Sequence, residues 1–92
     1  MVGSLTLELH IPASNSLKAK RSVLNSVKER IKNKFSASVA EVDNFDLWQR
    51  ATIGVAVVSS EKGIVENILA SVVRLVEADG RVNLLDYQID FL

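Results

Sequence analysis

The residues best suited to chemistry in this chain are seven lysines and arginines between positions 16 and 36, where Glu29 is the only acid. The rest of the chain carries four basic and ten acidic residues, so a net charge of zero conceals a segment of +6 and a remainder of −6. A local excess of cations attracts polyanions and anionic ligands. This segment is therefore the first candidate for a binding site.

Four of these basic residues share one side of a predicted helix. At about 100° per residue they form a single stripe, which we call the basic stripe: Lys18, Arg21, Lys28 and Lys32. Acids at four-residue spacing, which would pair with them on an ordinary solvated helix, are largely missing. The stripe is either a solvated surface or a docking site for RNA or a ribonucleoprotein, and both interpretations stay open.

Lys20 lies off this stripe, at helical angles close to those of Leu24 and Val27. The favoured interpretation is that its stem packs on the core while its ammonium snorkels into water. In the alternative, Lys20 joins Lys18 and Arg21 in holding an anion at the start of the helix, where free amide donors and the helix dipole add to the charge.

The remaining candidates for catalysis are few. His10 lies on the polar side of a predicted strand and could act as an acid or base, with Lys20 beside it, but we rank an enzyme as the least favoured function. Glycines at positions 3, 54, 63 and 80 form no nucleotide-binding loop. One histidine and no cysteine predict no metal site, and no cofactor is expected.

The only tryptophan, Trp48, stands with Gln49 and Arg50 at the entry to a predicted strand. A tryptophan in this place is most often a lid over the core, which is the interpretation that we favour. The alternative is a binding anchor, because tryptophan and arginine at a loop edge are typical of interaction sites. His10, Trp48, Gln49 and Arg50 are therefore kept as possible interaction residues.

Six elements are needed to position these residues. Alternating apolar and polar residues predict strands at 2–11, 36–42 and 50–59, with a last strand in which Asp86, Gln88 and Asp90 alternate with apolar residues. Apolar residues at three- and four-residue spacing predict a helix at 17–34, capped by Ser16. A second helix follows a cap at Ser59 or Ser60 and is stopped by Gly80.

This order predicts an α+β fold, a ferredoxin-like βαββαβ plait with a four-stranded antiparallel sheet and both helices on one face. Residues 1–92 make one domain. The open face of the sheet should present Thr6, Glu8 and His10 beside Thr52, Gly54, Ala56 and Val58, with no aromatic residue for stacking bases. Its small residues suit contact with a second copy, so a homodimer that binds a small anion or a protein is the alternative function.

The composition and the pattern of the first residues indicate the cellular compartment of the protein. The 48% hydrophobic and 24% charged content are those of a globular protein, and cysteine is absent. Residues 1–10 alternate apolar with polar types, unlike a signal peptide or a membrane span. We expect a cytoplasmic protein without membrane contact.

Three blocks of the sequence carry a family resemblance: Ser16-Leu17-Lys18-Ala19-Lys20-Arg21, Ser38-Val39-Ala40-Glu41-Val42, and Asp46-Leu47-Trp48-Gln49-Arg50-Ala51 followed by Gly54-Val55-Ala56. They resemble the YlxP-like family of bacterial proteins of unknown function. The resemblance implies a ferredoxin-like fold. It also implies a role linked to translation or RNA, since members are often encoded beside translation-initiation and ribosome-maturation genes, and it implies no catalytic residue.

The leading hypothesis is thus a non-enzymatic accessory module, linked to translation or ribosome maturation, that contacts RNA or a ribonucleoprotein through the basic helix. Trp48 and Arg50 would lie at the edge of that contact.

Overall fold

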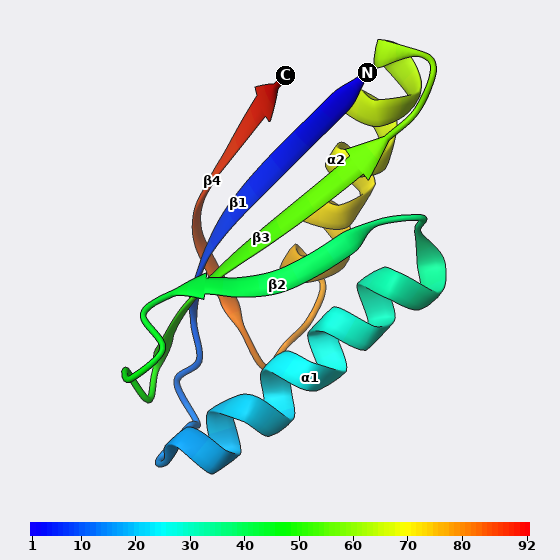
Figure 1. Cartoon of the computed structure of the whole chain (residues 1–92). Coiled ribbons are helices and arrows are strands. Elements are labelled where there is room, and N and C mark those ends of the chain that lie inside the picture. The colour runs from blue at the N-terminus through cyan, green and yellow to red at the C-terminus, as the bar shows by residue number, and fades with distance from the viewer.

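The computed structural model describes all 92 residues as one sheet with two helices. Its elements are β1 (Val2–His10), α1 (Leu17–Lys34), β2 (Ser38–Asp43), β3 (Arg50–Val58), α2 (Lys62–Glu77) and β4 (Asn83–Phe91). The strands run in the order β2-β3-β1-β4, and every neighbouring pair is antiparallel. The predicted ferredoxin-like plait is confirmed (Figure 1).

Both helices cover the same face of the sheet, because their buried residues belong to one hydrophobic cluster with alternate residues of the central strands. Leu5, Leu7 and Leu9 of β1 contribute to this cluster and are fully buried. Figure 1 shows α1 alongside the edge strand β2, while α2 runs along the central strands. No helix of the chain has the length and hydropathy required to cross a membrane.

The open face carries the residues predicted for it. The register between β1 and β3 pairs Thr6 with Gly54 and Ser4 with Ala56, so small side chains lie opposite one another. They border a shallow groove of about 340 Å³ between β1, β3 and β2. Val42 and Val58 are exposed, at 50% and 73%.

The element boundaries agree with the sequence prediction for α1 and differ by up to three residues in the strands. β1 ends at His10 and β3 at Val58, each one residue early, and β2 begins two residues late at Ser38. β4 begins at Asn83, before the predicted alternation, because it pairs with β1 beyond an irregularity between Glu8 and Leu9.

Both predicted end signals of α2 are wrong. Its N-cap is Glu61, which makes no capping bond through its side chain, so neither serine before it is the cap. The helix ends at Glu77, and Gly80 does not adopt the left-handed conformation that would stop it. Instead Asp79 turns the chain, since its amide donates to the Val76 carbonyl and its carboxylate accepts from the Arg81 amide.

Candidate nucleic-acid interface

The basic stripe lies on the outside of α1 and has no anionic partner within the chain. The helix begins where predicted, at a cap in which the Ser16 hydroxyl accepts a hydrogen bond of 3.0 Å from the Ala19 amide. Lys18, Arg21 and Lys32 are exposed and Lys28 is half-buried. None of the four residues takes part in any of the five salt bridges of the structure. Their charges are available to a ligand.

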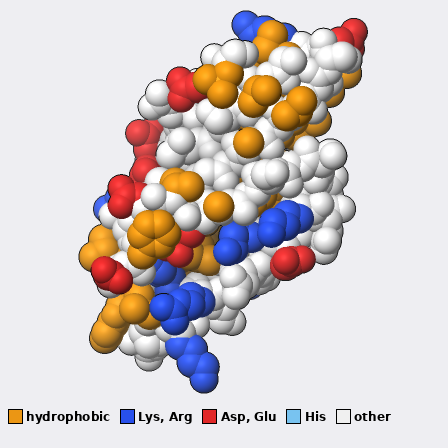
Figure 2. Space-filling model, in the orientation of Figure 1, with side chains coloured by type: hydrophobic (Ala, Val, Ile, Leu, Met, Phe, Trp, Pro, Cys, Tyr) orange, Lys and Arg blue, Asp and Glu red, His pale blue; other side chains and the backbone are white.

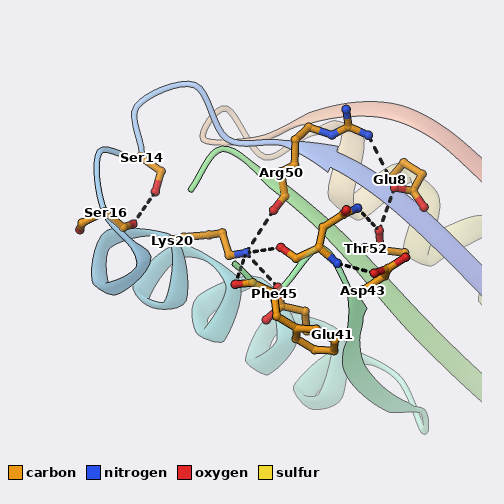
Figure 3. A network of polar contacts seen from close by, with 10 residues as sticks. Glu8, Ser14, Ser16, Lys20, Glu41, Asp43, Phe45, Arg50 and Thr52 are labelled. Atoms are coloured by element: carbon orange, nitrogen blue, oxygen red, sulfur yellow. Dashed lines mark hydrogen bonds and ion pairs between the residues drawn. The ribbon is translucent and has the colours of Figure 1, made fainter. Parts of the chain in front are cut away.

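Lys20, two residues after the start of this stripe, has a different environment. Its side chain is 1% exposed, and its ammonium donates to the carbonyl oxygens of Asn44, Phe45 and Arg50 at 2.9, 3.2 and 3.1 Å. The expectation that this ammonium snorkels into water is therefore wrong. The stem passes between helix and sheet, and the carbonyl partners belong to the loop between β2 and β3 and to the first residue of β3 (Figure 3).

Glu41 of β2 supplies the counter-charge for Lys20. Its Oε2 lies 3.0 Å from the Lys20 Nζ, on the side of β2 that faces the helices. The three ammonium protons are already directed at three carbonyls, so this oxygen gains an electrostatic contact without a hydrogen bond of its own. A charge buried in this way is stable only because oxygen atoms surround it. We call this arrangement the Lys20 clamp.

The clamp holds the loop between β2 and β3 against α1. Asn44 adopts a left-handed conformation with φ of 60°, which asparagine tolerates better than most residues. Its side-chain amide donates to the Thr52 hydroxyl, which in turn donates to Glu8 at 2.8 Å. Arg50 lies 3.8 Å from the same Glu8 oxygen. Figure 3 shows these contacts converging on one end of the sheet.

The clamped loop presents three large apolar side chains to solvent. Phe45 is 56% exposed, Leu47 48% and Trp48 55%. The prediction that Trp48 forms a lid over the core is wrong, because more than half of its side chain is exposed and it does not pack against the core cluster. Exposed aromatic residues on a fixed loop are the usual composition of a binding anchor.

Gln49 ties this loop to the segment that precedes α1. Its amide donates to the carbonyl oxygens of Pro12 and Ser14 at 3.2 and 3.3 Å. A cavity of about 510 Å³ lies between the two segments and is lined by Trp48 and Arg50 among others. The indole therefore borders a recess next to the start of the basic helix.

The loop and the stripe belong to one side of the molecule. Figure 2 shows basic side chains in a row along α1 and hydrophobic side chains over the neighbouring loop between β2 and β3. We call this surface the loop–helix face, composed of the basic stripe with Phe45, Leu47 and Trp48. It combines cations that can contact phosphates with aromatic rings that can stack on bases.

His10 is placed apart from Lys20, so the structure does not assemble the acid–base pair considered above. It lies on the open sheet face, where its Nδ1 is 3.4 Å from the side-chain nitrogen of Asn83. The Lys20 ammonium is enclosed by its four oxygen partners.

The sequence prediction missed several residues that matter here. Glu41 reads as one polar residue in a short edge strand, although its two-residue spacing from Val39 places it on the helix side. Phe45 and Leu47 lie in a segment that the sequence predicts only as a turn, so their exposure was not expected. Asp79 was also missed: Arg81 binds it through two nitrogens, and this pair lowers the pKa of the Asp79 carboxyl to about 2.

Comparisons with known proteins find a matching family model, a similar relative and a solved structure of similar fold. Residues 2–89 match the model of a family described as "Protein of unknown function (DUF503)". The chain is 37% identical over 78 residues to the uncharacterized protein YlxP of Bacillus subtilis (strain 168), covering 85% of each chain. A solved structure of the de novo designed protein Ferredog-Diesel aligns with 99% of this chain and 85% of its own, with a TM-score of 0.55 and 12% identity. That last likeness concerns the fold alone.

Proposed function

The chain belongs to the DUF503 family of proteins of unknown function, and from this premise we propose that it is a non-enzymatic, cytoplasmic accessory module that contacts RNA or a ribonucleoprotein through the loop–helix face. One observation carries the proposal. Four cations without internal partners lie beside three exposed apolar side chains on a loop that is fixed in place. We further propose that this contact links the protein to translation or to ribosome maturation.

Charge and rigidity both support this proposal. A solvated helix surface would leave lysines free, but it would not require a neighbouring loop to expose Phe45 and Trp48. Exposing these rings to water costs free energy, which contact with a partner recovers. Because the Lys20 clamp fixes the loop beforehand, binding requires little further ordering of the backbone.

The contact differs from that of RNA-binding domains with the same fold, which stack bases on the open sheet face. Here that face carries no aromatic residue among the side chains of β1 and β3, as predicted. Single-stranded RNA would instead lie along α1, with its phosphates on the basic stripe and one or two bases on Trp48 or Phe45.

The test is a titration of fluorescently labelled single-stranded RNA, followed by anisotropy at several salt concentrations. Four phosphate contacts predict that log K falls against log salt with a slope of about −3. Replacing Lys18, Arg21, Lys28 and Lys32 together by glutamine should abolish most of this slope. Trp48→Ala should weaken binding by about 1–3 kcal/mol at every salt concentration, since stacking depends little on salt.

Lys62→Gln is the matched control, because Lys62 is an exposed lysine of α2, away from the loop–helix face. It should bind RNA like the unmodified chain. If the unmodified chain shows no RNA binding at low salt, or if Lys62→Gln weakens binding as much as the stripe variant, the proposal fails.

A second candidate function uses the open sheet face as a homodimer contact. The observation that favours it is the groove beside Gly54 together with the exposure of Val42 and Val58. A second copy would cover these apolar side chains. Light scattering at micromolar concentration tests this: a dimer that Val42→Glu converts to monomer supports it, and a monomeric unmodified chain contradicts it.

A further inference from the structure

A groove of about 690 Å³ lies between the carboxyl-terminal halves of α1 and α2. Its basic and polar lining residues are Arg30, Asn33 and Lys34 of α1 with Ser71 and Arg74 of α2. No acidic side chain lines it. On helical geometry Arg30 and Lys34 point away from the basic stripe, so this groove is separate from the loop–helix face.

The positive charge in the groove exceeds what the neighbouring acid can balance. Asp79 is the only carboxylate in contact with a lining residue, through Arg30 Nη1 at 2.9 Å. The same carboxylate is already held by two nitrogens of Arg81 at 2.8 and 3.0 Å. Lys34 and Arg74 form no salt bridge at all.

The helix ends do not account for these cations. Basic residues in a last turn often donate to the free carbonyls there and offset the helix dipole. Arg74 instead donates to the Ser71 hydroxyl at 2.9 Å, and Lys34 lies 5.8 Å from the centre of the Phe35 ring. Both side chains are exposed and line the groove, and neither donates a hydrogen bond to a helix-end carbonyl.

The remaining wall of the groove is apolar, formed by Phe35, Leu75 and Ala78. A concave site that combines several cations with an aromatic ring suits a ligand that has an anionic group and a planar group. Concave surfaces also focus the field of the charges that line them. Asn33 and Ser71 add hydrogen-bonding groups to the lining.

We propose that the groove between α1 and α2 binds a nucleoside phosphate, with the phosphate held by Arg30, Lys34 and Arg74 and the base against Phe35. The phosphate would compete for Arg30 with Asp79, which keeps Arg81 as its partner. The ligand is either a free nucleotide or the phosphorylated end of an RNA strand, which present the same chemistry. This site does not depend on the loop–helix face.

The experiment is an NMR titration of the isotope-labelled chain with adenosine monophosphate, inorganic phosphate and adenosine, each raised to low millimolar concentration. The nucleotide should shift the amide signals of residues 30–35 and 71–78, and it should bind more tightly than phosphate or adenosine alone. Absence of these shifts, or shifts confined to the start of α1, overturns the proposal. Equal affinity for phosphate and nucleotide overturns the role of Phe35.

Variants locate the site. Arg74→Gln and Lys34→Gln should each weaken nucleotide binding at least about tenfold, as expected for loss of a charged hydrogen bond. Lys18→Gln, a matched change on the basic stripe, should leave it unchanged. All three residues are exposed, so the fold should survive, which the unperturbed spectra verify. Retained affinity in Arg74→Gln and Lys34→Gln contradicts the site.

Two RNA strands that differ only in a 5′-phosphate or a 5′-hydroxyl distinguish the sources of the ligand. The site is assigned to an RNA end if the groove signals shift only with the phosphorylated strand and if that strand binds more tightly than the free nucleotide. Stronger binding of the free nucleotide assigns it to a small molecule. Whether or not the stripe variant binds both strands more weakly, it should bind the free nucleotide like the unmodified chain, so failure of the RNA-docking proposal leaves this one to be judged separately.

Discussion

Lys18 and Lys20 are two positions apart on the same helix and have opposite environments. Lys18 is exposed and has no charged partner, while Lys20 is 1% exposed and lies among four oxygen atoms. A rotation of about 200° along the helix separates them, which turns one lysine to solvent and the other to the sheet. The comparison shows that residue type identifies a cation, whereas helical position decides whether that cation stays free in solvent or is bound within the fold.

Arg30, farther along the same helix, is intermediate between Lys18 and Lys20 in its number of polar partners. Its side chain is 48% exposed and shares Asp79 with Arg81. One helix therefore carries a buried cation that is fully coordinated, a partly exposed one that shares its acid, and a stripe that has none. Three variants test this ranking by stability, and a fourth at the helix cap is a reference that changes no charge.

Lys20→Met should have the largest effect. It would leave the Glu41 carboxylate without its counter-charge and three carbonyl oxygens without their donor, so we expect a loss of about 3–5 kcal/mol in the free energy of unfolding. Urea denaturation followed by circular dichroism measures it. Adding Glu41→Leu to Lys20→Met should restore part of the loss, because the unpaired carboxylate is then gone. A loss below 1 kcal/mol would place Lys20 with the exposed lysines.

Asp79→Asn should have the next largest effect. Arg81 lowers the pKa of the Asp79 carboxyl from 3.8 to about 2, which corresponds to about 2 kcal/mol of stability at neutral pH. Because the folded-state pKa lies below the unfolded one, this stability is present above about pH 4 and is lost as the pH falls through about 2.

The measurement for Asp79 is therefore a pair of denaturation series, with the unmodified chain and Asp79→Asn compared at neutral and acidic pH. The difference should be large at neutral pH and close to zero near pH 2. Glu77→Gln, a matched change at an exposed acid of α2, should show no such dependence. A difference that stays constant with pH would contradict the assignment.

Ser16→Ala should cost about 1 kcal/mol, the usual value for losing an N-cap side chain. This change alters the start of α1 without touching any of its charges. Thermal unfolding measures it, and Ser22→Ala, an exposed serine inside the same helix, is the control. Equal effects at both serines would mean that the cap hydrogen bond contributes nothing.

The fourfold glutamine variant of the basic stripe should have the smallest effect on stability, within about 0.5 kcal/mol of the unmodified chain. Removing like charges can even stabilise α1 slightly. Denaturation at low and high salt measures this difference, which should shrink as salt screens the charges. A loss as large as that of Lys20→Met would show that the stripe belongs to the fold and is not free for a partner.

Most of the fold follows from the sequence because its signals are local. The alternation of Leu5, Leu7 and Leu9 and the helical spacing of Leu24, Val27 and Ile31 each determine which face is buried. The environment of Lys20 does not follow, because its partners lie 21 to 30 residues away and are mostly backbone carbonyls. Every residue has a backbone carbonyl group, so no pattern of residue types predicts which carbonyl groups will contact Lys20.

The candidate sites also divide into features that local sequence signals predict and features that depend on tertiary packing. The basic stripe could be predicted because its four residues belong to one helix and share one face. The exposure of Trp48 depends on how the loop closes, and the groove between the helices depends on how α1 and α2 sit over the sheet. These features arise from tertiary packing, which single-residue preferences do not contain.

The Lys20 clamp also has a consequence for the order of folding. Its bonds join a helix to a loop that is distant in sequence, so the loop can close only after α1 has docked and the ammonium has left water. Until that step, Phe45 and Trp48 sample many positions. We therefore expect the loop–helix face to be completed late in folding, and a partner that binds it would distinguish the folded chain from its folding intermediates.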